Sequence, residues 1–168
     1  LTLLGKTYKK HDTCVYSKDV YVKDKLYTMQ ILSQNNIPHP KTMLVKNPID
    51  SNYVQRNIGF PIVVKSLSGT HGKGVYLADN KRNFEQLVEM MEQFNDRFNI
   101  ILQEFVSDSF GKDLRIIVVG GKVIGAMKRE SIDGDFRANI TRGGGAKPVD
   151  LDEQMEYLAL ESTKLLGL

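Results

Sequence analysis

The residues of this sequence most suited to chemistry are a lysine and the glycines that follow it. Lys65 ends the apolar run 61–65, and Gly69, Gly72 and Gly74 come next, interleaved with serine and threonine. A glycine-rich backbone can turn so that several N–H groups point at one anion. Together with the Lys65 ammonium, such a loop predicts a phosphate-binding site. An ordinary glycine–serine hairpin with an exposed lysine is the alternative.

Two common phosphate loops do not fit this pattern. In a Walker A loop, the second of two glycines separated by four residues is followed by Lys and then by Ser or Thr. Here Gly69 and Gly74 have that spacing, but Val75 follows Gly74. A dinucleotide fingerprint needs other glycine spacings and a helix afterwards, whereas residues 75–78 predict a second strand. A glycine loop between two strands is typical of a flap that folds over phosphates, as in kinase-like sites. The pattern therefore indicates ATP held under a hairpin.

Arginines gather later in the chain, beside a second glycine cluster. Arg129 ends a predicted strand, and Arg137, Asn139 and Arg142 lie in a polar loop just before the glycines 143–145. Arginines beside a flexible loop suit a transferring phosphoryl group, because they stabilise the charge that spreads over its oxygens. These residues are candidates for catalysis.

Two shorter patterns leave alternatives open. Glu104 and Phe105 lie where a strand runs into a loop, a place where main-chain groups can pair with adenine, and a plain strand end is the alternative. Asp113 and Arg115 share one face of a predicted strand, where they can equally form a simple ion pair.

The elements that must position these residues are helices mixed with strand hairpins, which predicts an α+β fold with antiparallel sheets. Apolar spacing predicts helices after Asp24, after Asp50 or Ser51, after Asn80 and after Asp150, the last with Glu153 in a capping box. Strands are expected at 42–45, 61–65, 75–78, 100–106, 114–119 and 122–127, and a long working loop at 131–146.

Composition narrows the class of protein. With 168 residues, 41% of them hydrophobic, the chain can form one domain or two small lobes around a proper core. The single cysteine, Cys14, excludes an internal disulfide, and no apolar run reaches transmembrane length, so a soluble cytoplasmic protein is expected. The net charge of +3 reflects a lysine-rich opening, which indicates a solvated surface more than a nucleic-acid or acidic partner. Neither a nucleic acid nor a membrane is an expected partner.

Five motifs in one order resemble the RimK-type branch of the ATP-grasp ligases, the branch of the ligases that add glutamate to the C-terminus of a ribosomal protein. They lie at 24–26 with 37–40, 61–75, 101–106, 111–120 and 134–144, and the resemblance runs from about Lys18 onward. It implies an ATP-grasp fold, in which two α+β lobes with antiparallel sheets clasp ATP, truncated here at both ends. Residues 1–23 would be a remnant of an N-terminal region or linker, and 24–168 a partial ATP-grasp domain. Its small lobe would span about 24–106, and the second lobe would start at about 107–168.

The resemblance also implies roles for individual residues. Lys25 and Lys65 would bind nucleotide phosphates, Glu104 and Phe105 would hold adenine through their main chain, and Asp113 would meet the ribose region. The flap residues implied for nucleotide binding are Gly69, Thr70, His71, Gly72 and Gly74, of which His71 stands where the family pattern admits various residues. The residues implied to face the γ-phosphate and the acyl phosphate are Arg129, Arg137 and Asn139.

The magnesium ligands of the family have no counterpart in this sequence. They are an aspartate and a later Glu-x-Asn, which would follow Leu168. We therefore expect ATP and Mg²⁺ as cofactors, no metal ligand among these 168 residues, and no amide formation by these residues alone.

The expected function is that of an ATP-dependent carboxylate–amine ligase, which forms an acyl phosphate and then an amide. In the family, an amino acid, commonly glutamate, is added to a protein, peptide or small-molecule carboxylate. The expected partners are therefore ATP, an amino acid and a carboxylate such as a protein C-terminus, and a homo-oligomer is left open. The alternative is a non-catalytic nucleotide-binding module, or an inactive fragment that lacks the metal ligands.

Overall fold

The computed structural model describes residues 2–3, 6–7, 25–66, 74–94, 98–132, 134–138 and 144–168. The chain divides into two compact units. The smaller unit is Pro40–Phe105, and the larger unit combines Leu1–His39 with Val106–Leu168. Each unit contains helices and an antiparallel sheet, so the fold class is α+β, as the sequence predicts.

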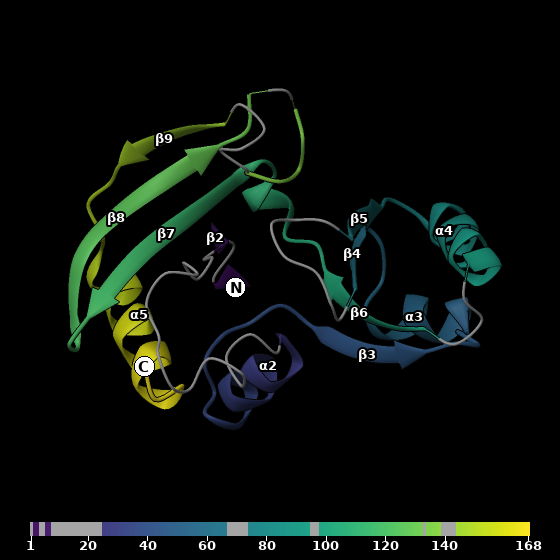
Figure 1. The fold of residues 1–168 in the computed structure, drawn as a ribbon, viewed down its shortest axis with the longest axis horizontal. Helices are drawn as coiled ribbons and strands as arrows, with labels where there is room; N and C mark the ends of the chain where they lie inside the picture. The colour runs from purple at the N-terminus through teal and green to yellow at the C-terminus, as the bar shows by residue number, and fades with distance from the viewer. Residues whose placement is uncertain are drawn as a thin grey trace. The chain divides into compact units, whose positions relative to one another are not determined.

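The smaller unit is built on a four-stranded sheet in the order β3-β6-β4-β5 (Figure 1). The strands are β3 (Thr42–Lys46), β4 (Ile62–Ser66), β5 (Val75–Ala78) and β6 (Asn99–Glu104), and the helices are α3 (Ser51–Asn57) and α4 (Lys81–Phe94). The predicted hairpin of β4 and β5 is confirmed, and the Ser66 N–H donates to the Gly74 carbonyl oxygen at 2.9 Å where the strands enter the connecting loop. Asp50 and Asn80 cap α3 and α4, also as predicted.

Side-chain alternation gives this sheet two different faces. One face is apolar and packs with Val54 and Phe84 of the helices. Its fully buried strand residues are Ile62, Val64, Ile100 and Leu102. Each contributes about 1.5–3 kcal/mol by leaving water, and a one-residue slip would turn all of them outward, so the register is firmly set. Lys65 and Gln103 belong to the alternate set and point to the opposite face.

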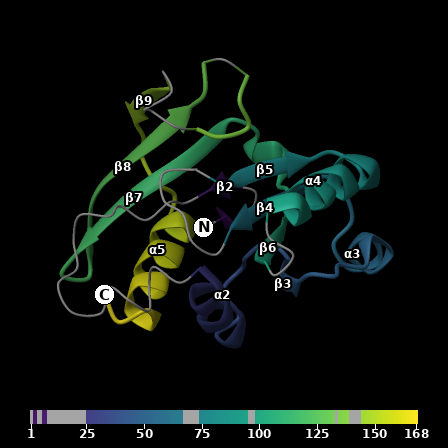
Figure 2. The same ribbon diagram turned by 45° about the vertical axis from the view of Figure 1, so that its right-hand side comes forward.

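The larger unit contains a three-stranded antiparallel sheet in the order β7-β8-β9, with helix α5 along one face of β7 and β8 (Figure 2). Its elements are α2 (Lys25–Gln34), the short 3-10 turn η1 (Ser107–Ser109), β7 (Lys112–Val119), β8 (Lys122–Glu130), β9 (Gly145–Pro148), α5 (Glu153–Leu165) and the short pair β1 (Thr2–Leu3) and β2 (Lys6–Thr7). The core cluster joins both helices to β7 and consists of Met29, Leu32, Ile37, Leu114 and Leu158.

A β-bulge in the β7–β8 hairpin determines which residues face each other across it. The pairs nearest the Gly120–Gly121 turn are Val119–Lys122 and Val118–Val123, and the next pair is Ile117–Gly125. Ile124 is therefore an extra residue on β8. Beyond the bulge, Asp113 lies opposite Arg129, on the face of the sheet away from Leu114 and the helical core.

Two sequence predictions about the end of the chain are wrong. The N-cap of α5 is Asp152, whose side chain accepts from the Met155 N–H at 2.7 Å, and not Asp150. Glu153 is then the first helical residue and cannot complete a capping box. The expected loop 131–146 also ends earlier, because β9 adds an edge strand whose residues are all exposed and so carry no hydrophobic alternation.

The division of the chain differs from the expected lobes at one segment. The boundary between Phe105 and Val106 lies next to the one expected, but residues 25–39 group with the larger unit. The reason is packing, because Met29 and Leu32 of α2 and the following Ile37 join the core of β7 and α5. The assignment of residues 1–23 to an N-terminal region or a linker stays a prediction.

None of the helices described above combines the length and the apolar composition that a membrane span needs.

Candidate functional site

Lys65 belongs to a hydrogen-bonded chain of polar side chains in the smaller unit. Its ammonium donates to Gln103 Oε1, Gln103 Nε2 donates to Thr42 Oγ1 at 2.9 Å, and Thr42 Oγ1 donates to the Pro40 carbonyl oxygen at 2.8 Å. Gln103 is buried. Because an amide is neutral, Gln103 fixes the direction of the ammonium without cancelling its charge.

The strand end at Glu104 and Phe105 is tied to neighbouring segments of the same unit. The Lys41 N–H donates to Glu104 Oε2 at 3.1 Å, and the Glu104 N–H donates back to the Lys41 carbonyl oxygen at 2.9 Å. The Phe105 N–H donates to the Pro61 carbonyl oxygen at 3.3 Å. Both main-chain N–H groups of this predicted adenine site therefore already donate within the unit.

Asp113 and Arg129 form a buried ion pair across the β7–β8 hairpin. Arg129 Nε donates to Asp113 Oδ1 at 2.7 Å, and Arg129 Nη2 donates to Asp113 Oδ2. The exposed fractions of the two side chains are 1% for Asp113 and 5% for Arg129. The paired geometry is that of a strong, two-point arginine–carboxylate contact. Asp113 thus does form an ion pair, as one alternative predicted, and Arg129 across the hairpin is a partner that the sequence did not indicate.

Arg137 is held by an aspartate of its own loop. Its Nε lies 3.0 and 3.1 Å from the two Asp135 carboxylate oxygens, and its Nη2 donates to Oδ2 at 2.8 Å. The Arg137 N–H also donates to Asp135 Oδ1 at 3.0 Å, and the guanidinium lies over the Phe136 ring at 5.2 Å. About a fifth of each charged side chain is exposed, so this pair lies at the surface of the unit.

Gly111 anchors that loop to the start of β7. The Gly111 N–H donates to the Phe136 carbonyl oxygen at 3.2 Å, and the Ser131 N–H donates to the Gly111 carbonyl oxygen at 2.7 Å. Gly111 has a φ of +63°, and a Cβ there would lie 3.0 Å from the Asp135 carbonyl oxygen. Only glycine fits this turn without strain and without pushing the loop away.

An open pocket of about 310 Å³ lies beside this anchor in the larger unit. It is lined by Phe110, Gly111, Lys112, Glu130, Ser131, Gly134 and Asp135. The Lys128 ammonium, 2.6 Å from Glu130, lowers the pKa of the Glu130 carboxyl by its hydrogen bond and charge. The pocket thus combines a carboxylate that stays ionised with the exposed Lys112.

The family of the chain follows from a match over most of its length. A family model described as the RimK-like ATP-grasp domain matches residues 22–168. The chain belongs to this family.

A curated relative supports the same family. The chain is 41% identical over 147 residues to "Probable alpha-L-glutamate ligase 2" of Pseudoalteromonas atlantica, an alignment that covers 87% of this chain and 48% of the relative. The chain spans about half the length of the curated relatives it matches.

Solved structures show the ATP-grasp fold. A D-alanine–D-alanine ligase from Bacillus anthracis has a TM-score of 0.69 at 16% identity, covering 89% of this chain and 50% of that one. A RimK domain ATP-grasp protein from Sphaerobacter thermophilus has a TM-score of 0.68 at 19% identity, covering 89% and 52%.

The structure places the predicted ATP-grasp residues in three groups. Lys65, Glu104 and Phe105 lie on adjacent strands β4 and β6 or just beyond, and Gly74 closes the β4–β5 hairpin. Asp113, Arg129 and Arg137 lie in the larger unit, as does Lys25, the first residue of α2. Five predicted residues lie outside the described part of the chain: Gly69, Thr70, His71, Gly72 and Asn139.

Sequence reasoning missed the polar residues that orient the cations of this ATP-grasp domain. Gln103 and Thr42 were not candidates, although a glutamine directly after the apolar residues 100–102 was an available signal. Asp113 was a candidate for a different role, because its partner across the hairpin depends on the bulge.

The described residues alone do not fit a magnesium site. Among them, no three His, Cys, Asp or Glu side chains are grouped to hold a metal ion. The two carboxylates nearest the arginines, Asp113 and Asp135, are each engaged by a guanidinium.

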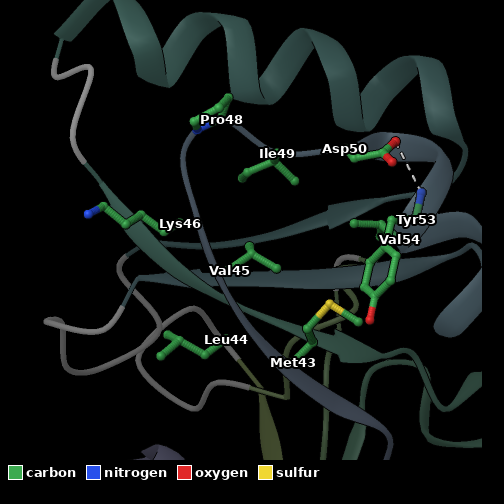
Figure 3. Close-up of a pocket in the computed structure, with 9 residues that line it drawn as sticks. All are labelled: Met43, Leu44, Val45, Lys46, Pro48, Ile49, Asp50, Tyr53 and Val54. Carbon is green, nitrogen blue, oxygen red and sulfur yellow. Dashed lines mark hydrogen bonds between the residues drawn. The ribbon is translucent and has the colours of Figure 1, made fainter.

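A second open pocket, of about 300 Å³, lies between β3 and the start of α3 in the smaller unit (Figure 3). Met43, Val45 and Ile49 line it together with Tyr53, whose main-chain N–H donates to Asp50 Oδ1 at 3.2 Å. Asp50 is occupied as the helix cap, and the remaining lining mixes apolar side chains with Lys46 and Tyr53.

Proposed function

We propose that this chain is the ATP-binding part of a carboxylate–amine ligase. The observation that carries the proposal is the state of its cations. Lys65, Arg129 and Arg137 are each oriented by a second side chain of the same unit. Groups fixed in advance towards developing charge need no reorganisation during reaction, which is the main way that proteins assist phosphoryl transfer.

In the proposed reaction, a carboxylate oxygen attacks the γ-phosphorus of ATP, and the bond from that phosphorus to the β,γ-bridging oxygen breaks. ADP leaves and an acyl phosphate forms. The nitrogen of an amine then attacks the acyl carbon, inorganic phosphate leaves, and the nitrogen loses a proton to give the amide. Lys65 would neutralise the phosphates of bound ATP, and Arg129 and Arg137 would stabilise the charge on the transferring group and on the acyl phosphate. Asn139 belongs to the same proposal.

The proposed amino-acid substrate is glutamate. The family and the alpha-L-glutamate ligase named among its relatives support this choice. The carboxylate would belong to a protein, a peptide or a small molecule. The pocket beside Gly111 has one cation, Lys112, and two carboxylates, Glu130 and Asp135, on its wall, so it offers both signs of charge to a zwitterionic amino acid.

Magnesium, a cytoplasmic location and the remaining nucleotide contacts are part of the proposal. ATP in cells carries Mg²⁺, and its consumption suits the cytoplasm. Because the described residues do not form a metal cluster, we derive no step through the ion. Lys25, the flap residues from Gly69 to Gly74, and the main chain at Glu104 and Phe105 remain proposed nucleotide contacts.

The test is ADP release by the protein at the full length that its gene encodes. The assay supplies ATP, Mg²⁺ and each amino acid in turn, with peptides and small acids as carboxylates, and mass spectrometry identifies the amide. We expect turnover with glutamate, and its loss in Lys65→Ala.

Lys81→Ala is the matched control, because Lys81 begins α4, whose core residue Phe84 packs on the opposite face of the sheet from Lys65. ATP binding with no ADP release for any substrate pair would contradict the ligase and favour a nucleotide-binding module.

A further inference from the structure

We propose that the outer edge of strand β3 is a dimerisation surface, which pairs with β3 of a second copy of this protein. β3 is the first strand of the sheet β3-β6-β4-β5, and within the described part of the chain β6 is the strand that pairs with it. An antiparallel β3–β3 pair would join the four strands of each copy into one continuous sheet. The inference goes beyond the proposed function and does not depend on ligase activity.

The hydrogen bonds to β6 show which main-chain groups of β3 point outward. The Lys41 carbonyl oxygen accepts from the Glu104 N–H at 2.9 Å, and the Asn47 N–H donates to the Phe98 carbonyl oxygen at 3.3 Å. In an antiparallel pair, the residues that bond to the partner strand alternate along the chain. The odd-numbered residues from 41 to 47 therefore bond to β6. The residues whose N–H and C=O groups point to the outer edge are Thr42, Leu44 and Lys46.

These outward groups are self-complementary about Leu44. When β3 pairs with a second β3 centred on this residue, Leu44 lies opposite Leu44 of the second copy, and Thr42 lies opposite Lys46. All the outward N–H and C=O groups of the three residues then have a partner. Lysines do not face each other directly in this register, so the pair avoids the repulsion of like charges.

Prolines bound the edge symmetrically. Pro40 and Pro48 each lie four residues from Leu44, and a proline has no N–H to donate. In the centred register the two prolines lie opposite each other, beyond the last hydrogen bond. A shift by two residues would place a proline opposite Thr42 or Lys46, whose outward carbonyl oxygen would lose its donor. This symmetry favours a second copy over an unrelated peptide, whose sequence has no reason to match it.

The side chains at this edge are largely apolar. Leu44, at the centre of the strand, is 45% exposed. On the other face of the strand, the open hollow of about 300 Å³ is lined in part by Met43, Val45, Ile49 and Tyr53 (Figure 3). In the centred register Met43 lies opposite Val45 of the second copy, so apolar side chains of that copy would enter the hollow. Their burial would stabilise the pair, and an exposed apolar strand edge is a template for pairing with another chain.

The first experiment measures the mass of the full-length protein by sedimentation velocity over a range of micromolar concentrations. We expect a dimer in the wild type. We expect its dissociation constant to rise about tenfold or more in Leu44→Lys, because the two leucines are replaced by like charges that face each other. Tyr76→Lys is the matched control, since Tyr76 lies on β5 at the opposite edge of the sheet and is 47% exposed. A monomeric wild type, or an equally strong dimer in Leu44→Lys, would overturn the proposal.

The second experiment tests the register by cross-linking. In a full-length background without other cysteines, Cys14→Ser included, Leu44→Cys places one thiol of each copy at the centre of the pair. Directly opposite residues of an antiparallel pair have Cα atoms up to about 5.5 Å apart, which a disulfide can span. We expect a covalent dimer of Leu44→Cys under mild oxidation and none of Tyr76→Cys. Failure of Leu44→Cys to form it would overturn the centred pair.

A proline at the same position separates pairing from folding. Because the Leu44 N–H points outward, Leu44→Pro removes a hydrogen bond of the proposed dimer but none to β6. We expect this variant to be monomeric and folded by circular dichroism. Met43→Pro, which removes a hydrogen bond to β6, should instead lose structure. A dimer that survives Leu44→Pro would overturn the proposal.

Maleimide labelling identifies any other occupant of the edge. The curated relatives are about twice as long as this chain, so another segment of the full-length protein could cover β3. If the full-length protein is monomeric and the Leu44→Cys thiol resists maleimide, such a segment is the occupant. If the thiol of a monomer reacts freely, the edge is open. Either result would overturn the proposal, whereas a dimer without ADP release would contradict the proposed function alone.

Discussion

Three of the four cations assigned to phosphates, Lys65, Arg129 and Arg137, are each held by a second side chain, but the holders differ in charge. Gln103, a neutral amide, orients Lys65, whereas the carboxylates of Asp113 and Asp135 orient Arg129 and Arg137. A neutral partner orients the cation without offsetting its charge. A carboxylate partner orients the cation more strongly but also offsets part of its attraction for another anion. Lys65 therefore suits binding of ATP, and the arginines suit the transfer step.

Replacement of Lys65 should weaken nucleotide binding without unfolding the protein. We expect Lys65→Ala to reduce ATP affinity by roughly 1.5–3 kcal/mol, the range for a hydrogen bond to a charged group. Calorimetric titration with ATP measures the loss, and Lys81→Ala on α4 should bind as the wild type does. If Lys65→Ala bound ATP with wild-type affinity, Lys65 would have only a structural role.

The absence of charge on the Gln103 side chain should affect ATP affinity independently of the size of that side chain. Gln103→Glu keeps the size of the side chain and its bond to Lys65 but turns the contact into an ion pair. We expect a somewhat lower stability to urea, because a glutamate cannot donate to Thr42 Oγ1 as Gln103 Nε2 does. We also expect an ATP affinity lowered by less than the roughly 1.5–3 kcal/mol of a hydrogen bond to a charged group. Equal ATP affinity in Gln103→Glu and the wild type would mean that the charge of Lys65 is not used by the nucleotide.

At the scale of elements, the β7–β8 hairpin shows which features a sequence reveals and which it does not. Two glycines in succession predict a two-residue turn with positive φ at both, and the φ values are +56° and +74°. A regular hairpin about that turn would place Asp113 opposite Lys128. The bulge at Ile124 moves the partner to Arg129, and nothing in the local sequence marks Ile124 as the extra residue.

The missed strand and the misplaced cap have a similar cause. Residues 145–148 form β9 at the edge of the sheet with every residue exposed. The strand therefore has no alternation of hydrophobic and polar residues from which it could be predicted. Asp150 and Asp152 are equally good capping residues by type. The structure selects Asp152, with Leu158 two turns further on in the core.

The two aspartates before α5 make a matched pair for testing the helix cap. We expect Asp152→Ala to lower the free energy of unfolding by about 0.5–2 kcal/mol, because the Met155 N–H loses its acceptor. Asp150→Ala should change it by less than about 0.5 kcal/mol, as for an ordinary surface substitution. Urea denaturation of both variants provides the comparison. A larger loss of unfolding free energy in Asp150→Ala would show that Asp150 is the cap, as the sequence predicted.

Gly111 links β7 to the arginine-bearing loop, and its replacement should loosen both. An alanine at positive φ costs about 1–2 kcal/mol in strain, and here its Cβ would also press on the Asp135 carbonyl oxygen. Gly134→Ala is the control, since Gly134 has a similar φ of +67° and nothing within 4 Å of the added Cβ. We expect Gly111→Ala to be the more destabilising in urea and to lower ligase turnover more than Gly134→Ala. Equal losses of stability would show that the contact with the loop has no energetic consequence.

At the scale of the whole molecule, the sequence predicts the fold class and family better than the grouping of segments. The motifs that run in order from residues 61–65 to 134–144 are local, so an error in the predicted helix boundaries does not affect their recognition. Residues 25–39 precede the smaller unit in sequence but share a core with α5 near the end of the chain. A contact between segments more than 100 residues apart has no local signal, so that part of the division could not be predicted.

The presence of phosphate-binding candidates in both units leads to a prediction about the whole chain. A ligand that binds the folded state suppresses opening of the segments it contacts. If ATP uses groups of both units, as the proposed function requires, it should slow amide exchange in two places: residues 101–106 of the smaller unit and residues 129–138 of the larger. Hydrogen-exchange mass spectrometry with a non-hydrolysable ATP analogue measures both segments, with α4 as the internal reference.

ADP is the control that shows which part of the protection depends on the γ-phosphate. It should keep most of the protection at 101–106, because Lys65 and the adenine contacts remain, and lose protection at 129–138, because the arginines then lack the group they are proposed to stabilise. Protection confined to the smaller unit with both nucleotides would leave nucleotide binding intact but would remove Arg129 and Arg137 from phosphoryl transfer. The alternative binding-module function would then account for the chain better than the ligase.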